Sequence, residues 1–260
     1  MNKMIYLVFA LLMTVALFAG CSEQNPESDL EYILNNGKIV VGITEYAPMD
    51  FKDENGEWTG FDAEFSRLFA EELGVECEFY VIADWSKKFY ELETKQIDVI
   101  WNGMTINEDV TLNTSCSNPY VINAQVVVMK SDRIASYPHT ASLASLTVAV
   151  EDGSAGQDAA IAAGIRNIIP LRDQAAALME VAAGTSDACV IDITMAYAMT
   201  GEGTSYADLG FALRLTEEEY GVGFRKGSDV TDRFNEFMAK LMADGTLDAL
   251  AEKYDLTLVK

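Results

Sequence analysis

The chain has 260 residues, half of them hydrophobic, which is enough to bury the core of one large domain or of two smaller ones. Its 18 Lys and Arg stand against 41 Asp and Glu, and the formal net charge of −23 argues against nucleic acid and against unaided adsorption to an anionic membrane. With one His, His139, and four scattered Cys, the spacings of a zinc site are absent, and no metal or other cofactor is expected.

Residues 1–20 have the pattern of an export signal. Lys3 supplies a positive start, and the apolar run from Met4 to Ala19 is shorter than the roughly 20 residues of a membrane span. The end of the run, "LFAGC", resembles the lipobox of bacterial lipoproteins, although Phe18 stands where Leu is more usual. The resemblance implies that Cys21 is lipidated and anchors the protein outside the cytoplasm, on a Gram-positive surface or a periplasmic membrane face. The alternative is an ordinary cleaved signal with an incidental Cys.

The next segment, residues 21–36, is polar and acidic and is predicted to be a tether, flexible at least in its first half. A strand–helix–strand–helix–strand series follows. Strands are predicted over 38–44, 76–82 and 97–101, with helices over 62–73 and 85–94 between them. A second series starts with the strand 124–130. It continues through a strand, a Gly-containing loop and a helix within 145–164, a strand over 165–171, a helix closed by Gly184 and a strand over 187–192. A strand over 220–227 and two amphipathic helices, 230–243 and 246–254, end the chain.

Two such α/β halves place a ligand cleft at the carboxyl ends of their strands. The predicted fold class is therefore α/β. Cys77 and Cys189 fall in strand-like runs and are expected to be small core residues, and no disulfide is assigned among Cys77, Cys116 and Cys189.

Several stretches resemble, in order, the polar-amino-acid substrate-binding proteins of ABC importers, the bacterial extracellular solute-binding proteins of family 3. They are "YAPMDFKDENGEWTGFDAEF", "DWSKKFYELETKQIDVIWNGMTI", "SNPYVINAQVVVMK", "VAVEDGSAG", "SDACVID" and "YGVGFRKGSD", and the resemblance covers roughly residues 38–255. It implies the two-lobed type 2 periplasmic-binding-protein fold, each lobe a mostly parallel sheet flanked by helices. Lobe 1 would hold residues 37–119 and 221–260, lobe 2 residues 125–215, and two hinge strands, 120–124 and 216–220, would join them.

The resemblance also implies a function and a binding site. A monomer outside the cytoplasm would capture a small zwitterionic amino acid or a close derivative between its lobes and deliver it to an ABC permease. Seven positions match the family's ligand contacts: Tyr46, Trp85, Gly103, Thr105, Ser154, Ala155 and Asp192. Tyr46 and Trp85 would face the ligand side chain, and Gly103, Thr105, Ser154 and Ala155 would hold its α-carboxylate. Asp192 would pair with its α-ammonium. Each position also has a structural alternative: Trp85 or Tyr46 as core, Gly103 as a turn residue, Asp192 as a helix N-cap.

The sequence departs from the family pattern at the cationic residue that binds the ligand carboxylate. The Arg that binds the carboxylate in this family falls on Val110 here, and a Lys seen in some relatives is Glu151. A carboxylate would then be held by amides and Thr105 alone, by another cation such as Arg172 or Lys87, or the ligand would be an amine with a neutral or differently placed carboxylate.

An enzyme on this fold needs a positioned acid or base; Asp192 and Glu45 are candidates, but no third group suggests a reaction, so the chain is expected not to be an enzyme. A sensory role would need a separate signalling partner, and an orphan lipoprotein with an empty cleft is the remaining alternative.

Overall fold

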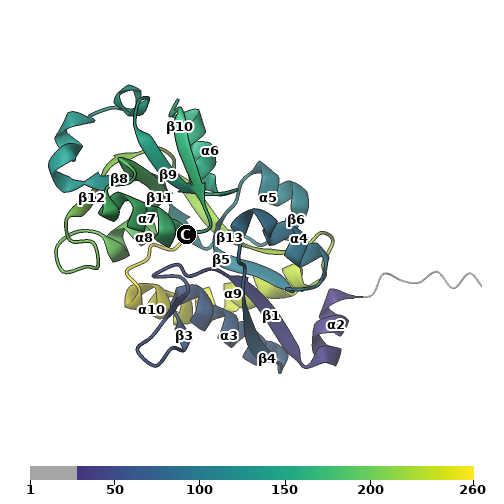
Figure 1. The fold of residues 1–260 in the computed structure, drawn as a ribbon. Helices are drawn as coiled ribbons and strands as arrows, with labels where there is room; N and C mark the ends of the chain where they lie inside the picture. The colour runs from purple at the N-terminus through teal and green to yellow at the C-terminus, as the bar shows by residue number, and fades with distance from the viewer. Residues whose placement is uncertain (1–27) are drawn as a thin grey trace, which may run out of the picture.

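The computed structural model describes residues 28–260 (Figure 1). The predicted export signal, residues 1–20, and the predicted lipid attachment at Cys21 lie outside the described residues. Over the described part of the chain, the helices are too short or too polar to cross a bilayer.

The first lobe is built on a mixed sheet with strand order β4-β1-β5-β13-β6, and β7 pairs with β13 as well. Its strands are β1 (Lys38–Ile43), β4 (Glu76–Val81), β5 (Val99–Thr105), β6 (Thr114–Cys116), β7 (Val121–Asn123) and β13 (Glu218–Arg225), with a small hairpin of β2 (Phe51–Lys52) and β3 (Trp58–Thr59) beside it. Its helical segments are α2 (Asp29–Asn36), α3 (Phe61–Leu73), the 3-10 turn η1 (Trp85–Lys87), α4 (Lys88–Glu93), α5 (Glu108–Asn113), α9 (Val230–Ala243) and α10 (Thr246–Lys253).

Aromatic side chains form the core of this lobe. Phe65 and Phe69 lie one helical turn apart on α3, and both contact Trp101 of β5 and Phe234 of α9. The helix ends at Gly74, which takes the left-handed conformation that favours glycine. The i, i+4 spacing in the sequence thus produces the stripe that fixes α3 on the sheet.

The second lobe has a five-stranded mixed sheet in the order β10-β9-β11-β8-β12. Its strands are β8 (Gln125–Lys130), β9 (Thr147–Glu151), β10 (Asn167–Leu171), β11 (Ala188–Asp192) and β12 (Leu209–Arg214). Helices α6 (Ala155–Ala162), α7 (Gln174–Ala183) and α8 (Ile193–Met199) accompany them, and two 3-10 segments, η2 (Ser131–Ser136) and η3 (Thr140–Leu143), connect β8 to β9. Figure 1 shows this lobe beside the first, with the label of β13 between them.

Two adjacent segments join the lobes. β7 pairs antiparallel with the start of β13, Asn123 opposite Glu218 and Val121 opposite Tyr220. The Leu215 N–H then donates to the Gln125 carbonyl at 2.8 Å. The chain therefore crosses between lobes twice at the same place, where hinge strands over 120–124 and 216–220 are expected.

The sheets are less parallel than expected. β1, β4 and β5 are parallel, as are β9, β10 and β11, but β13, β6 and β7 in lobe 1 and β8 and β12 in lobe 2 join antiparallel. The antiparallel strands are those that carry the chain toward and away from the hinge. Because the chain crosses between the lobes in opposite directions at one place, the segments that enter and leave each lobe there run antiparallel.

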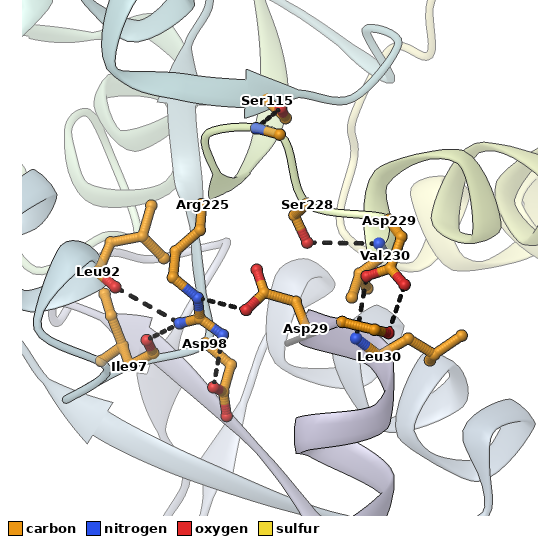
Figure 2. A network of polar contacts seen from close by, with 12 residues as sticks. Asp29, Leu30, Leu92, Ile97, Asp98, Ser115, Arg225, Ser228, Asp229 and Val230 are labelled. Carbon is orange, nitrogen blue, oxygen red and sulfur yellow. Dashed lines mark hydrogen bonds and ion pairs between the residues drawn. The ribbon is translucent and has the colours of Figure 1, made fainter. Parts of the chain in front are cut away.

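The range 21–36, predicted as a tether, also differs in its second half, because Asp29–Asn36 forms helix α2. Arg225 of β13 donates to Asp29 at 2.8 Å, to Asp98 at 3.1 Å and to the Ile97 carbonyl at 2.8 Å (Figure 2). Asp229 accepts from the Leu30 N–H at 3.0 Å. The start of α2 is thus fixed to lobe 1 by partly buried ionic contacts that the sequence pattern alone does not reveal.

Candidate functional site

The candidate site is the cleft between the lobes, at the ends of β5, β9 and β11. It contains a cavity of about 40 Å³, which is too small for an amino acid. Lobe 1 lines it with Trp85, Lys88, Asn102, Gly103, Met104, Thr105, Asn107, Asp109 and Val110. Lobe 2 lines it with Gln125, Glu151, Gly153, Ser154, Ala155, Gly156, Asp158, Gln174 and Asp192. The lobes are closed on each other, so a ligand of amino-acid size requires them to open.

Asp192 ends β11 and lines the cleft with only 4% of its surface exposed. Its carboxylate accepts hydrogen bonds from the side-chain amides of Asn123, Gln125 (2.8 Å) and Gln174. It makes no capping bond to α8, although it occupies the N-cap position, so the N-cap alternative is not what holds its side chain.

Two further carboxyl groups surround Asp192. Glu151, at the end of β9, is 4% exposed and also lines the cleft. Glu218, in the hinge, accepts from the Gln125 side chain at 3.0 Å, the same amide nitrogen that binds Asp192. Burial and then Glu218 raise the pKa of Asp192 to about 6, and burial and then Asp192 raise the pKa of Glu151 well above its usual range. The cleft is therefore poised to accept positive charge.

Trp85 and Lys88 contribute the lobe 1 wall that faces these carboxylates. Both are buried, and the Lys88 Nζ lies 5.0 Å from the Trp85 ring centroid. The same Nζ donates to the Gly153 carbonyl of lobe 2 at 2.9 Å. Lys88 was not predicted as a site residue. The sequence did contain one indication, because Lys88 falls on the same apolar helix face as Trp85 and Leu92.

Ser154 and Ala155 stand at the beginning of α6, as expected. Ser154 is the N-cap, and its hydroxyl accepts from the Gln157 N–H at 3.2 Å and donates to the Glu151 carbonyl at 2.8 Å. Within residues 28–260, the N–H groups of Ala155 and Gly156 have no hydrogen-bond partner. Free N–H groups at a helix start favour an anion.

Gly103 and Thr105 line the cleft, but their polar groups already have partners. The Gly103 N–H donates to Asp62 at 2.6 Å, and the Thr105 hydroxyl donates to Glu218 at 2.8 Å. Val110 is buried in the apolar cluster of Trp85, Leu92 and their neighbours. The loop of residues 103–110 therefore presents fewer free hydrogen-bond donors to a ligand carboxylate than expected.

Tyr46 is not among the residues that line the cavity. Its buried hydroxyl bonds with Thr194 of lobe 2 at 2.6 Å and with Tyr220 of the hinge. Gly103 lies directly on its ring, since a Cβ there would be 2.6 Å from the ring edge. In this closed arrangement Tyr46 supports the loop and joins the lobes.

The other sequence candidates lie apart from the cleft. Arg172 pairs with Asp173 and is 75% exposed, while Lys87 and Glu45 are exposed and outside the lining. Cys77, Cys116 and Cys189 are free thiols; Cys189 is buried as expected, and Cys77 is half-buried. The part of the chain described here contains no cluster of three or more His, Cys, Asp or Glu able to hold a metal ion.

Comparison with known proteins agrees with this architecture. The profile of the bacterial extracellular solute-binding proteins, family 3, matches residues 39–257. The L-cystine-binding protein TcyJ of Escherichia coli is 28% identical over 94% of this chain and 92% of its own length. The arginine-binding extracellular protein ArtP of Bacillus subtilis is 27% identical over 98% of both chains. A mutant of arginine-bound ArgBP from T. maritima superposes with a TM-score of 0.75, at 30% identity over 82% of this chain and 99% of that one.

A two-lobed α/β protein with a polar cleft at its hinge defines an extracellular solute-binding protein of the type 2 periplasmic class. The chain belongs to the bacterial extracellular solute-binding proteins of family 3.

Proposed function

We propose that this protein captures a cationic amino acid in the interlobe cleft, outside the cytoplasm, and delivers it to the permease of an ABC importer. The observation that carries the proposal is the charge of the cleft. Its lining contains four carboxyl side chains, those of Asp109, Glu151, Asp158 and Asp192, and one cationic side chain, that of Lys88. A ligand with an additional positive charge offsets this imbalance better than a neutral zwitterion.

Two of the relatives reported above support the same ligand class. ArtP is an arginine-binding protein, and ArgBP has been solved with arginine bound. In the proposed complex, Asp192 accepts the α-ammonium, and Glu151 lies near enough to Asp192 in the same lobe to attract a second cationic group. Trp85 forms the wall against which the side chain packs.

A thermal-shift panel tests this function. A ligand that binds only the native state raises the melting temperature in proportion to RT ln(1 + [L]/Kd). We expect shifts with L-arginine, L-lysine or L-ornithine and none with L-aspartate or L-glutamate. Asp192→Ala should abolish the shift, whereas Asp152→Ala, outside the cavity lining, should keep it. No shift with any amino acid, or a shift only with acidic ones, would contradict the proposal.

A cationic amine without a carboxylate is the second candidate. It is favoured by Val110 and by the Gly103 and Thr105 groups, which already bond to Asp62 and Glu218. Agmatine, putrescine and cadaverine in the same panel distinguish the two candidates, because each is the decarboxylated form of a basic amino acid.

Lipid on Cys21 would hold the protein at the membrane, and Cys21→Ser should release it to the soluble fraction. The protein is proposed to act as a monomer and without catalysis, since Glu45 is exposed and does not meet Asp192 in the cleft.

A further inference from the structure

Lys88 is a buried cation without a carboxylate in direct contact in the described part of the chain. It is 5% exposed, and its Nζ donates to the Gly153 carbonyl at 2.9 Å and, more weakly, to the Trp85 carbonyl at 3.5 Å. Within residues 28–260 it forms no ion pair; its other near neighbours are the rings of Trp85 and Phe89, 5.0 and 4.6 Å from Nζ. Burying an ammonium is costly unless it is paired, so a lysine held only by carbonyls and rings indicates a charged partner that arrives from outside.

The position of Lys88 indicates that this partner is an anionic group of the ligand. Its carbonyl acceptor, Gly153, lies two residues before Ala155, so the ammonium reaches the corner of the cleft where α6 begins. There the N–H groups of Ala155 and Gly156 have no partner in the described chain. A cation from lobe 1 and two N–H donors from lobe 2 therefore approach one corner, and both favour a ligand anion.

The other groups of lobe 1 that were expected to bind the carboxylate are not available for it. Val110 is apolar and buried, the Gly103 N–H donates to Asp62, and the Thr105 hydroxyl donates to Glu218. Arg172 and Lys87 do not line the cavity. Lys88 is the one Lys or Arg in the lining of this cavity.

From this geometry we infer that Lys88 binds the α-carboxylate of the ligand, with the first amides of α6 as its second support. The inference rests on the proposed function. It makes Lys88 a specificity residue that distinguishes an amino acid from the amine that lacks its carboxylate. The carboxylate replaces a neutral carbonyl acceptor by a charged one, which makes a stronger hydrogen bond.

Carboxyl groups of the protein compete for the same ammonium. Burial lowers the pKa of Lys88, while Glu151, Asp109, Asp158 and Asp152 all favour its charged form and offset part of that effect. Their attraction acts at a distance, however, since Lys88 contacts none of them within 4.0 Å in the described structure. A ligand carboxylate in direct contact would attract the ammonium more strongly, because electrostatic attraction increases as the distance between the charges falls.

Calorimetric titration of the purified protein with L-arginine and with agmatine tests the inference, with L-lysine and cadaverine as a second pair. The variants are Lys88→Met, which keeps an unbranched side chain without the charge, and Lys87→Met as the matched control. Lys87 is adjacent, exposed and outside the cavity lining. Melting curves of both variants establish that they fold.

In the wild type we expect the amino acid to bind at least tenfold more tightly than its amine. Lys88→Met should lower the preference for the amino acid over the amine by about tenfold to hundredfold, the range for a hydrogen bond to a charged group. Lys87→Met should change neither, and Lys88→Arg should retain the preference. Equal weakening of both ligands by Lys88→Met, or an unchanged ratio, would overturn the role of Lys88 while leaving the proposed function intact. Binding of the amine alone would overturn both.

Discussion

The backbone of Gly153 in lobe 2 lies against the backbone of Ser86 in lobe 1. A Cβ added to Gly153 would be 2.9 Å from the Ser86 Cα and 3.0 Å from its Cβ, and Gly153 has a φ of +68°. These atoms meet only when the lobes are closed, so the absence of a side chain at residue 153 permits closure.

Gly153→Ala should therefore weaken ligand binding by opposing closure. Each 1.4 kcal/mol added to the closed state lowers the affinity about tenfold. Gly164→Ala is the matched control, because Gly164 has a φ of +79° in the same lobe with nothing within 4 Å of an added Cβ. Both variants carry the backbone strain, but only Gly153→Ala should lose affinity and scatter X-rays as a more open particle. Equal affinities in the two would contradict the role of this contact.

The affinity for a cationic amino acid should fall as the pH drops below about 6. Asp192 has a pKa raised to about 6, mainly by burial, and its protonated form cannot pair with an ammonium. The raised pKa of Glu151 acts in the same direction, so binding a cation should also release protons. Titration calorimetry at several pH values, in buffers with different ionisation enthalpies, measures both effects. An affinity independent of pH between about 5 and 7.5 would count against Asp192 as the ammonium partner.

Asp62 should make the free protein less stable as the pH rises toward neutrality. It is fully buried, accepts from Gly103 and from the Tyr120 hydroxyl at 2.8 Å, and burial raises its pKa to about 7. Because the folded pKa lies above the unfolded one, its stabilising contribution is complete below the unfolded value, about 4, and is lost as the pH rises through about 7. The melting temperature of the ligand-free protein should decline across this window, and Asp62→Asn should flatten the decline. An unchanged slope in that variant would assign the effect to another group.

Arg225→Met should destabilise the fold by about 3 kcal/mol, because it leaves Asp98 and Asp29 buried without their cation. The Arg225 side chain is 11% exposed, whereas Lys38, paired with Glu78, is 43% exposed. Lys38→Met is thus a surface control that should cost little stability, because an exposed ion pair is screened by solvent. Urea unfolding measures both; similar losses in the two variants would show that burial does not decide the effect.

Much of the fold could be predicted from the sequence because its helices and central strands have clear periodicities. The helix predicted over 230–243 has those bounds in the structure, and β1, β4, β8 and α3 begin within one residue of expectation. Helices α2 and α5 were not predicted, since each is short and polar and is held by caps and long-range contacts rather than by an apolar stripe. Strand direction also requires tertiary information, which is why the antiparallel strands beside the hinge were missed.

The candidate site was predictable in position but less so in chemistry. Trp85, Gly103, Thr105, Ser154, Ala155 and Asp192 all line one cavity. Sequence alone could not show that the groups of Gly103 and Thr105 are engaged, because their partners, Asp62 and Glu218, lie 41 and 113 residues away. It could not single out Lys88 for the same reason: only the closed lobes bring its ammonium to Gly153.

Helix α2 is docked on lobe 1 through the ion pair between Asp29 and Arg225. If Cys21 carries lipid, eight Cα–Cα steps separate that anchor from Asp29, a reach of about 29 Å at most. Lobe 1 would then stay close to the bilayer while lobe 2 moves relative to it. The cleft would open and close in a restricted set of orientations above the membrane. A permease in the same bilayer would therefore encounter a binding protein whose distance and orientation are already restricted by the anchor. Fewer orientations would have to be sampled before the two proteins bind.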